Sequence, residues 1–216
     1  MRSMRGGTAA VAGAAAGEAW AMGALHGITL GWAICGSHHT LRQVLSVMAA
    51  VRNEGAEIIP VVSQTLTTTP TRHGTPEAWR ESIERAAGRP PLTTIPEVEP
   101  FGPDRSLDAL LIAPCTGNTL AKFAAAVTDS APLMAAKAQL RNDRPVVLGI
   151  TTNDALGLNA RNLATLLVCR NVYFVPFGQD SPHAKPRSLV AHFELCGETV
   201  TAALEGRQLQ PLLRGW

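Results

Sequence analysis

The segment DALLIAPCTGNT, residues 108–119, contains the pattern from which the rest of the chain can be interpreted. Its first part, DALLIA, is an aliphatic run of the kind found in strands buried on both faces of a parallel sheet. The small, polar residues that follow are typical of a turn, and a helix is expected at 118–127. A buried strand that continues through a polar turn into a helix predicts one unit of an α/β fold.

The same alternation of strand and helix continues on both sides of this segment. We expect strands at 28–35, 58–62, 108–113, 145–150 and 171–176, and helices at 40–54, 76–87, 118–127, 132–140, 155–169 and 188–204. Residues 88–104 contain five prolines and are expected to form an extended surface segment. The pattern predicts a doubly wound parallel sheet with helices on both faces, a Rossmann-like or flavodoxin-like three-layer sandwich.

Two features of the composition indicate how the chain divides into segments and in what redox state its cysteines are. Residues 1–26 are mostly Ala and Gly, so we expect a flexible N-terminal extension, followed by one domain over residues 27–216. The cysteines form no CxxC pair and match no zinc-module spacing, so we expect reduced thiols and no metal site. These cysteines are Cys35, Cys115, Cys169 and Cys196.

Charge and aromatic content argue against two classes of partner. The chain has 19 Lys and Arg against 17 Asp and Glu, so it lacks the basic excess of a nucleic-acid-binding domain. Aromatic residues make up only 5% of the chain, too few to favour base stacking. No run of about 20 uncharged apolar residues appears. We therefore expect a cytoplasmic protein that binds neither nucleic acid nor membrane.

Polar turns follow four of the expected strands, and in an open parallel sheet these turns meet at one edge, where ligands bind. The candidate cofactor-binding residues there are Gly36, Ser37, Ser63, Thr116, Gly117, Asn118, Thr119, Thr151, Thr152 and Asn153. Hydroxyls beside helix N-termini favour a phosphate group, although Ser, Thr and Asn are also common helix caps. Because GxGxxG and GxxxxGK[ST] are absent, the pattern favours a mononucleotide such as FMN over a dinucleotide or ATP.

Lys137 and Arg141 lie one helical turn apart and therefore share a face, with Arg144 nearby. They could form a cationic clamp for a dicarboxylate or phosphate, or simply a solvated face. His38 and His39 could supply a general acid or base, or could be polar loop residues.

Four further residues have two interpretations each. His73, beside Arg72, could act as an acid or base or be a loop residue. Cys115 could be a reactive thiol or a small residue packed at a strand end. Asp180 and Lys185 lie in a late loop that could cover a ligand or contact another protein chain.

Two segments resemble the homo-oligomeric flavin-containing Cys decarboxylases. APCTGNTLAKFAAAVTDS, residues 113–130, is similar to that family's APxxANTIAKxAxGIAD, and TTND, residues 151–154, stands in the place of its PAMN. The resemblance implies that Asn118 contacts a flavin and that Asn153 takes the place of the second family Asn. The methionine of PAMN is missing here, which disfavours decarboxylase activity.

Longer stretches resemble the flavoprotein B subunits of dipicolinate synthases. The matching stretches are GSHHT (36–40), TRHGT (71–75), EVEPFGP (97–103), APCTGNTLAKFAAAVTD (113–129), MAAKAQLRNDRPVV (134–147), TTNDALGLNARNL (151–163) and YFVPFGQDSPHAKPRSLVA (173–191). His38, His39 and His73 replace residues that are usually Phe or Cys in that family. The match implies a flavoprotein-like domain over residues 27–216.

This resemblance also implies an oxidoreductase component with bound FMN that acts during sporulation, in the mother cell. Its partner would be the NAD(P)-dependent A subunit of dipicolinate synthase, and together they would form dipicolinic acid from a dihydrodipicolinate-level precursor. A homo-oligomer, a trimer or a multiple of trimers, is implied by the wider family. The catalytic candidates are His38, from the chemistry of histidine alone, and Asn118, Lys137 and Asn153, with Lys137 and Arg141 holding the substrate carboxylate. Two alternatives remain: a non-catalytic scaffold that binds flavin or substrate, and a flavin-dependent decarboxylase.

Overall fold

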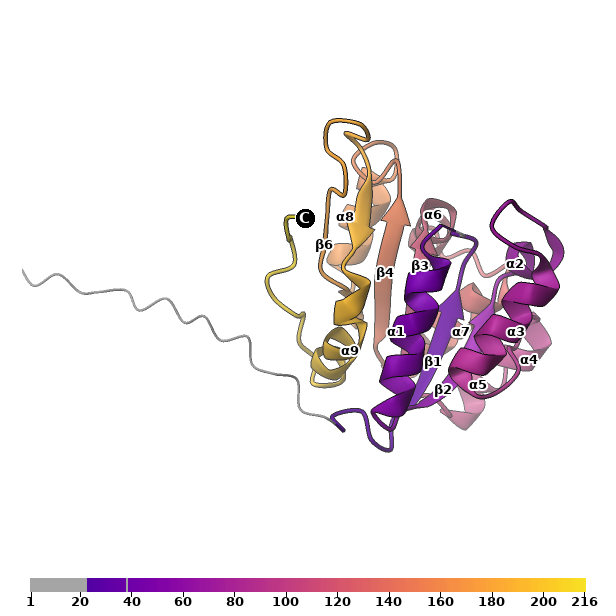
Figure 1. Ribbon diagram of the computed structural model, residues 1–216. Helices are drawn as coiled ribbons and strands as arrows, with labels where there is room; N and C mark the ends of the chain where they lie inside the picture. The colour runs from indigo at the N-terminus through magenta and orange to yellow at the C-terminus, as the bar shows by residue number, and fades with distance from the viewer. Residues whose placement is uncertain (1–22, 38) are drawn as a thin grey trace, which may run out of the picture.

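The computed structural model describes residues 23–37 and 39–216 around one central sheet (Figure 1). Five strands run parallel, namely β1 (Thr29–Ile34), β2 (Glu57–Val62), β3 (Ala109–Thr116), β4 (Val146–Thr152) and β5 (Val172–Phe174). Their spatial order is β2-β1-β3-β4-β5. This is the flavodoxin-like order, in which the direction of winding reverses between β1 and β3. The predicted α/β class is therefore confirmed, and the reversal places a crevice at the carboxyl ends of these two strands.

Helices cover both faces of the sheet and complete the three layers (Figure 1). One face carries α1 (Leu41–Asn53), α3 (Pro76–Ala87) and α9 (Cys196–Leu204), and the other carries α6 (Gly117–Ala124), α7 (Ala131–Arg141) and α8 (Ala160–Leu167). The limits of α3 follow from local chemistry. Thr75 Oγ1 accepts a hydrogen bond from Ala78 N at 3.3 Å, Pro76 occupies the first turn, and Gly88 ends the helix at φ 81°.

The C-terminal part of the sheet differs from the prediction. The predicted last strand at 171–176 is followed by β6 (Phe177–Gly178) and β7 (Leu189–Ala191), and β7 pairs antiparallel with both β4 and β6. The predicted helix at 188–204 was wrong over its first residues, since α9 begins only at Cys196, after the 3₁₀ turn η1 (Phe193–Leu195). Periodicity cannot separate a short buried strand from a helical segment, and the three residues of β7 are all buried.

The segment 88–104 is less extended than predicted. It contains the short helices α4 (Ile95–Val98) and α5 (Phe101–Asp104), and another short helix, α2 (Gln64–Thr68), follows β2. Glu97 forms a capping box with Thr94, and its carboxylate accepts hydrogen bonds from the backbone N–H of Thr93 and Thr94 at 2.9 and 2.8 Å. The capping hydrogen bonds allow a short helix to form despite the prolines, because proline is tolerated in the first turn of a helix.

The packed core begins earlier than the predicted domain boundary at residue 27. Leu25 lies in a turn before β1, is fully buried and belongs to the core cluster, so the residues just before position 27 are part of the fold. The predicted extension otherwise falls on residues 1–22, outside the described residues. Within residues 23–37 and 39–216, no helix has the length and apolarity needed to cross a bilayer.

Candidate functional site

Two adjoining pockets lie at the carboxyl ends of the parallel strands. The first, which we call the hydroxyl pocket, has a volume of about 400 Å³ and is lined by Cys35, Gly36, Ser63, Gln64, Thr65, Thr116, Asn118, Thr119, Lys122, Asp129, Ser130 and Leu133. The second, the cationic pocket, has a volume of about 720 Å³ and is lined by Gly36, Ser37, His39, Thr71, Arg72, His73, Thr116, Gly117, Thr151, Thr152, Asn153 and Lys185. Gly36 and Thr116 line both. All ten predicted cofactor-binding residues lie along one or both linings.

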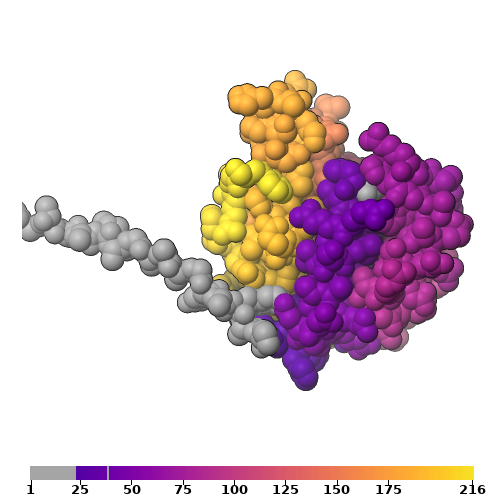
Figure 2. All heavy atoms as spheres, viewed as in Figure 1, coloured from indigo at the N-terminus to yellow at the C-terminus, as the bar shows by residue number. Residues whose placement is uncertain are grey.

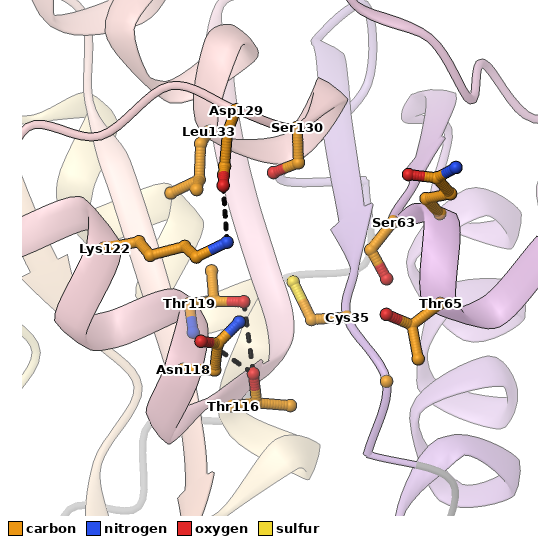
Figure 3. A pocket seen from close by; sticks show the side chains of 12 residues that line it. Cys35, Ser63, Thr65, Thr116, Asn118, Thr119, Lys122, Asp129, Ser130 and Leu133 are labelled. Carbon is orange, nitrogen blue, oxygen red and sulfur yellow. Dashed lines mark hydrogen bonds and ion pairs between the residues drawn. The ribbon is translucent and has the colours of Figure 1, made fainter.

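Ser63 contributes an unsatisfied hydroxyl to the hydroxyl pocket. It follows β2 and occupies the N-cap position of α2, but its side chain makes no capping hydrogen bond. Its Oγ is buried and has no hydrogen-bond partner among the described residues. Figure 3 shows Ser63 and Thr65 on one wall of the pocket, facing Thr116 and Thr119 on the other. A buried hydroxyl without a partner is costly, so this group points to a ligand.

The opposite wall is the first turn of α6. Thr116 caps this helix, because its Oγ1 accepts a hydrogen bond from Thr119 N at 3.3 Å and also lies 3.1 Å from Thr119 Oγ1. The capping interpretation is therefore correct for Thr116. The N-terminus of the eight-residue α6 nonetheless faces the pocket with its positive dipole end, and Asn118 is exposed there. β3 ends at Thr116, which pairs with Thr151 of β4 after a register shift between Ile112 and Cys115.

One ion pair lies at the hydroxyl pocket. Lys122 Nζ is 2.6 Å from Asp129 Oδ2, and both side chains are partly exposed (Figure 3). Cys35 lines the same space, and burial raises the pKa of its thiol to about 11, partly opposed by Thr119 and the Thr116 backbone. Burial also raises the pKa of Cys115, which lines neither pocket. Both thiols are thus neutral at pH 7, which favours the packing interpretation of Cys115 over a nucleophile.

The turn after β4 is held by a network that sequence reasoning missed. Asp154 accepts hydrogen bonds from Thr152 Oγ1 at 2.5 Å and from Asn159 Nδ2 at 2.8 and 2.9 Å. These hydrogen bonds lower the pKa of Asp154, and the bond from Thr152 has the largest effect. The residue types in TTND gave a signal of turn chemistry, but Asn159 lies outside that motif. The predicted helix from 155 begins at Ala160 because this turn precedes it.

Gly117 allows this network to pack against α6. A Cβ at position 117 would meet Thr152 Oγ1 most closely, and would lie 2.8 Å from Asn159 Nδ2 and 2.9 Å from Asp154 Oδ1. Only glycine therefore lets the start of α6 approach the turn after β4. This contact holds Thr116, at the end of β3, and Asn153, after β4, on the same pocket lining.

Basic side chains gather around the cationic pocket. Arg72 Nε lies 3.2 Å from His73 Nε2, and His39 Nδ1 lies 3.3 Å from Ser37 Oγ. Burial, then the charges of Lys185 and His73, lower the pKa of His39. Lys185 Nζ forms an ion pair at 3.0 Å with Asp180, which partly opposes the shift at His39. His38 lies outside the described residues.

Lys137 and Arg141 are not brought to either of these pockets. They are exposed and line a third, mostly apolar pocket of about 360 Å³ with Phe123, Val127 and Leu140. α7 begins near the hydroxyl pocket and runs away from it, so a rise of 1.5 Å per residue carries Arg141 roughly 15 Å from the start of the helix. Helical spacing placed the two side chains on one face without giving the direction of that face. Arg144 lies beyond α7, where it donates to Leu107 O and pairs with Asp108 at 3.3 Å.

Comparison with known proteins identifies the fold family. The sequence profile described as Flavoprotein matches residues 21–185. The chain belongs to the flavoprotein family. A relative, the B subunit of dipicolinate synthase from Bacillus subtilis (strain 168), is 48% identical over 192 residues, which cover 89% of this chain and 96% of the relative. The predicted resemblance to these B subunits is thereby confirmed.

Solved structures agree with the family assignment. The crystal structure of the dipicolinate synthase B subunit from Bacillus halodurans C superposes with a TM-score of 0.82 at 47% identity, over 88% of this chain and 98% of that one. The FMN-dependent cysteine decarboxylase SpaF superposes with a TM-score of 0.61 at 22% identity, over 84% of this chain and 97% of that one. This second likeness shows that the two chains share a fold.

Proposed function

We propose that this chain is the FMN-binding B subunit of a dipicolinate synthase, with the cofactor phosphate in the hydroxyl pocket. Membership of the flavoprotein family and the 48% identical B-subunit relative support the assignment. The observation that carries it is the buried Ser63 hydroxyl without a partner among the described residues, placed on a pocket between two helix starts.

The residues of the hydroxyl pocket suit a phosphate monoester. The hydroxyls of Ser63, Thr65 and Thr119 can donate to phosphate oxygens, and the first turn of α6 offers backbone N–H groups. Lys122 adds a positive charge at the same pocket, at present shared with Asp129. A bound phosphate would satisfy Ser63 and compete with Asp129 for the ammonium group.

Amide side chains on the two adjoining pocket linings suit the uncharged ring of a flavin. Asn118 lies at the start of α6 and Asn153 in the turn after β4, and both are exposed on their pocket linings. Thr151 and Thr152 continue this wall, which the contact at Gly117 holds in place. When bound, FMN supplies a two-electron acceptor, and the protein's contribution is binding and orientation.

We propose that the chain works with an NAD(P)-dependent A subunit on a dihydrodipicolinate-level dicarboxylate, in the mother cell during sporulation. A flavin-linked enzymatic role fits the family and the named relatives. We further propose self-association into trimers or multiples of trimers.

A binding experiment tests the cofactor assignment directly. The purified full chain is titrated with FMN while flavin fluorescence and absorbance are recorded, and Ser63→Ala is compared with Ser46→Ala, an exposed serine on α1. We expect the wild type and S46A to bind alike and S63A to bind about tenfold more weakly, as for the loss of one charge-assisted hydrogen bond. A colourless wild type that binds no added FMN contradicts the proposal.

A reconstitution experiment then tests whether the chain is a catalyst or a scaffold. The NAD(P)-dependent A subunit is assayed with its dicarboxylate substrate in the presence and absence of this chain. We expect turnover to be abolished when the chain is omitted, which is the behaviour of a catalytic component. Turnover that continues at the same rate without it supports the scaffold.

A further inference from the structure

We propose that the cationic pocket is the dicarboxylate subsite of this protein and that Arg72 and Lys185 bind the two carboxylates. This inference rests on the proposed function, which supplies the substrate class. It assigns that substrate to residues different from the Lys137 and Arg141 pair that helical spacing suggested.

Among the described residues, the charged side chains that line the cationic pocket are all basic. His39, Arg72, His73 and Lys185 come from three separate segments, and no carboxylate side chain is among the described residues that line the pocket. The whole chain has 19 basic and 17 acidic residues, so a pocket lining with basic side chains and no carboxylate among its described residues differs in charge from the protein's average surface. Asp180 lies behind the wall, paired with Lys185 at 3.0 Å, and does not line the pocket. The pocket therefore favours an anion.

Arg72 lies in a hydrogen-bonded turn, and a neighbouring side chain orients its guanidinium group. The turn that carries it is closed by hydrogen bonds from Thr71 N to Gly74 O at 3.0 Å and from Gly74 N to Thr71 O at 3.2 Å. Arg72 Nε donates a hydrogen bond to His73 Nε2 at 3.2 Å. Neither terminal nitrogen of the Arg72 guanidinium group forms a hydrogen bond with any of the described residues. A guanidinium fork held in this way is suited to a carboxylate.

Lys185 belongs to a different segment of the pocket lining from the turn that carries Arg72. The loop 179–188 between β6 and β7 carries Lys185, and Figure 2 shows this orange segment rising on one side of a hollow, with the purple segment near residues 64–75 on the other. Ser37 lines the same pocket, and its hydroxyl can hydrogen-bond a carboxylate oxygen. A ring with two carboxylates offers one anionic group to each wall.

The cationic pocket adjoins the hydroxyl pocket, the proposed site of the cofactor phosphate. Gly36 and Thr116 line both pockets, so a dicarboxylate in the cationic pocket lies beside the proposed FMN site. The third pocket, with Lys137 and Arg141, has in common with the hydroxyl pocket only Leu133 among the described residues, and its wall is mostly apolar. It offers no comparable route to the cofactor.

Isothermal titration calorimetry on the full chain tests this assignment, with pyridine-2,6-dicarboxylate as the probe and pyridine-2-carboxylate as the single-carboxylate comparison, each with and without FMN. The variants are Arg72→Gln and Lys185→Gln, the double variant K137Q/R141Q, and Arg170→Gln as a matched control on an exposed surface position. We expect R72Q and K185Q to weaken binding of the dicarboxylate at least tenfold and of the monocarboxylate less. K137Q/R141Q and R170Q should bind as the wild type does.

The outcomes separate this inference from the proposed function. FMN affinity is measured for each variant, and we expect R72Q and K185Q to keep it within about twofold. The inference is overturned if the wild type binds no dicarboxylate, if R72Q and K185Q bind it normally, or if K137Q/R141Q alone loses it. Equal losses of FMN and dicarboxylate in R72Q also overturn it, because the cationic pocket would then hold the cofactor phosphate. A wild type that binds the dicarboxylate but no FMN contradicts the proposed function. In that case, weaker dicarboxylate binding by R72Q still supports the assignment of this pocket.

Discussion

The carboxylate of Asp154 accepts hydrogen bonds from Nδ2 of Asn159 at 2.8 and 2.9 Å, and this pair holds the turn after β4 against the start of α6. The pair lies outside both pocket linings, yet it fixes Thr152 and Asn153, which belong to the cationic pocket. A residue that touches no proposed ligand therefore sets the shape of the site.

Replacing Asp154 by Asn should lower the free energy of unfolding by about 1 kcal/mol at pH 7, because it removes a partly exposed but well-bonded carboxylate. The hydrogen bonds lower the pKa of Asp154, so its stabilisation is present above the unfolded-state pKa of about 3.9 and is lost as the pH falls through the lower folded-state pKa. Urea unfolding at pH 7 and pH 3 measures the difference, which should shrink at pH 3. Asp143→Asn, at an exposed ion pair, is the control and should change stability by less than about 0.5 kcal/mol. An equal effect of D154N at both pH values contradicts the role of the ionised carboxylate.

Gly117→Ala should destabilise the protein by about 1–3 kcal/mol, since the added methyl group overlaps the side chains of Thr152, Asn159 and Asp154. FMN binding should weaken as well, because the start of α6 must move away from β4. Gly215→Ala is the control, as nothing lies within 4 Å of its Cβ position. Thermal unfolding and FMN titration of both variants provide the measurements. A G117A protein with normal stability and FMN affinity shows that the close approach is not needed.

The thiol of Cys35 should react slowly with iodoacetamide despite lining a pocket. Burial raises its pKa to about 11, so roughly one thiol in a thousand is ionised at pH 8, and the thiolate is the reactive form. Cys169 is exposed and serves as the internal reference. Peptide mass spectrometry after brief labelling at pH 8 should find Cys169 modified and Cys35 unmodified. Rapid labelling of Cys35 at the rate of Cys169 contradicts the raised pKa.

Dicarboxylate affinity should increase as the pH falls from 7.5 to 5.5. Burial, then Lys185 and His73, lower the pKa of His39, so the ring is mainly neutral at pH 7, while Asp180 acts in the opposite direction. A bound dianion facing His39, Arg72 and Lys185 favours the protonated ring, and by linkage protonation favours the dianion. Calorimetry across this pH range should give a slope that His39→Gln removes. An unchanged slope in H39Q assigns the proton uptake to another group.

The parts of the fold that depend on local pattern could be predicted from the sequence. The aliphatic runs of β1 to β4 and the Pro76 to Gly88 helix are determined by neighbouring residues, and the structure has them within a few residues of the predicted limits. β7 could not be predicted, because a buried three-residue strand carries no periodicity of its own. Leu25 belongs to the core although its neighbours in sequence resemble an unstructured extension.

The candidate site was partly predictable for a related reason. Turns after parallel strands meet by topology, so the hydroxyl and amide residues there could be grouped without coordinates. The direction of α7 could not be predicted, so the sequence did not show that Lys137 and Arg141 line a different pocket from the two at the strand ends. The grouping of Arg72 with Lys185 joins two loops more than 100 residues apart, and only the sheet order brings them together.

That long separation has a consequence for how the protein gains stability. The cationic pocket takes residues from positions 36, 37, 39, 71–73, 116–117, 151–153 and 185, so its lining is incomplete until β1, β3, β4 and the antiparallel C-terminal strands are all in place. No partly folded form that lacks one of these segments offers the complete pocket. A ligand that fills it binds the native state alone, and its binding free energy adds to the cooperative unfolding of the whole domain rather than to any single loop.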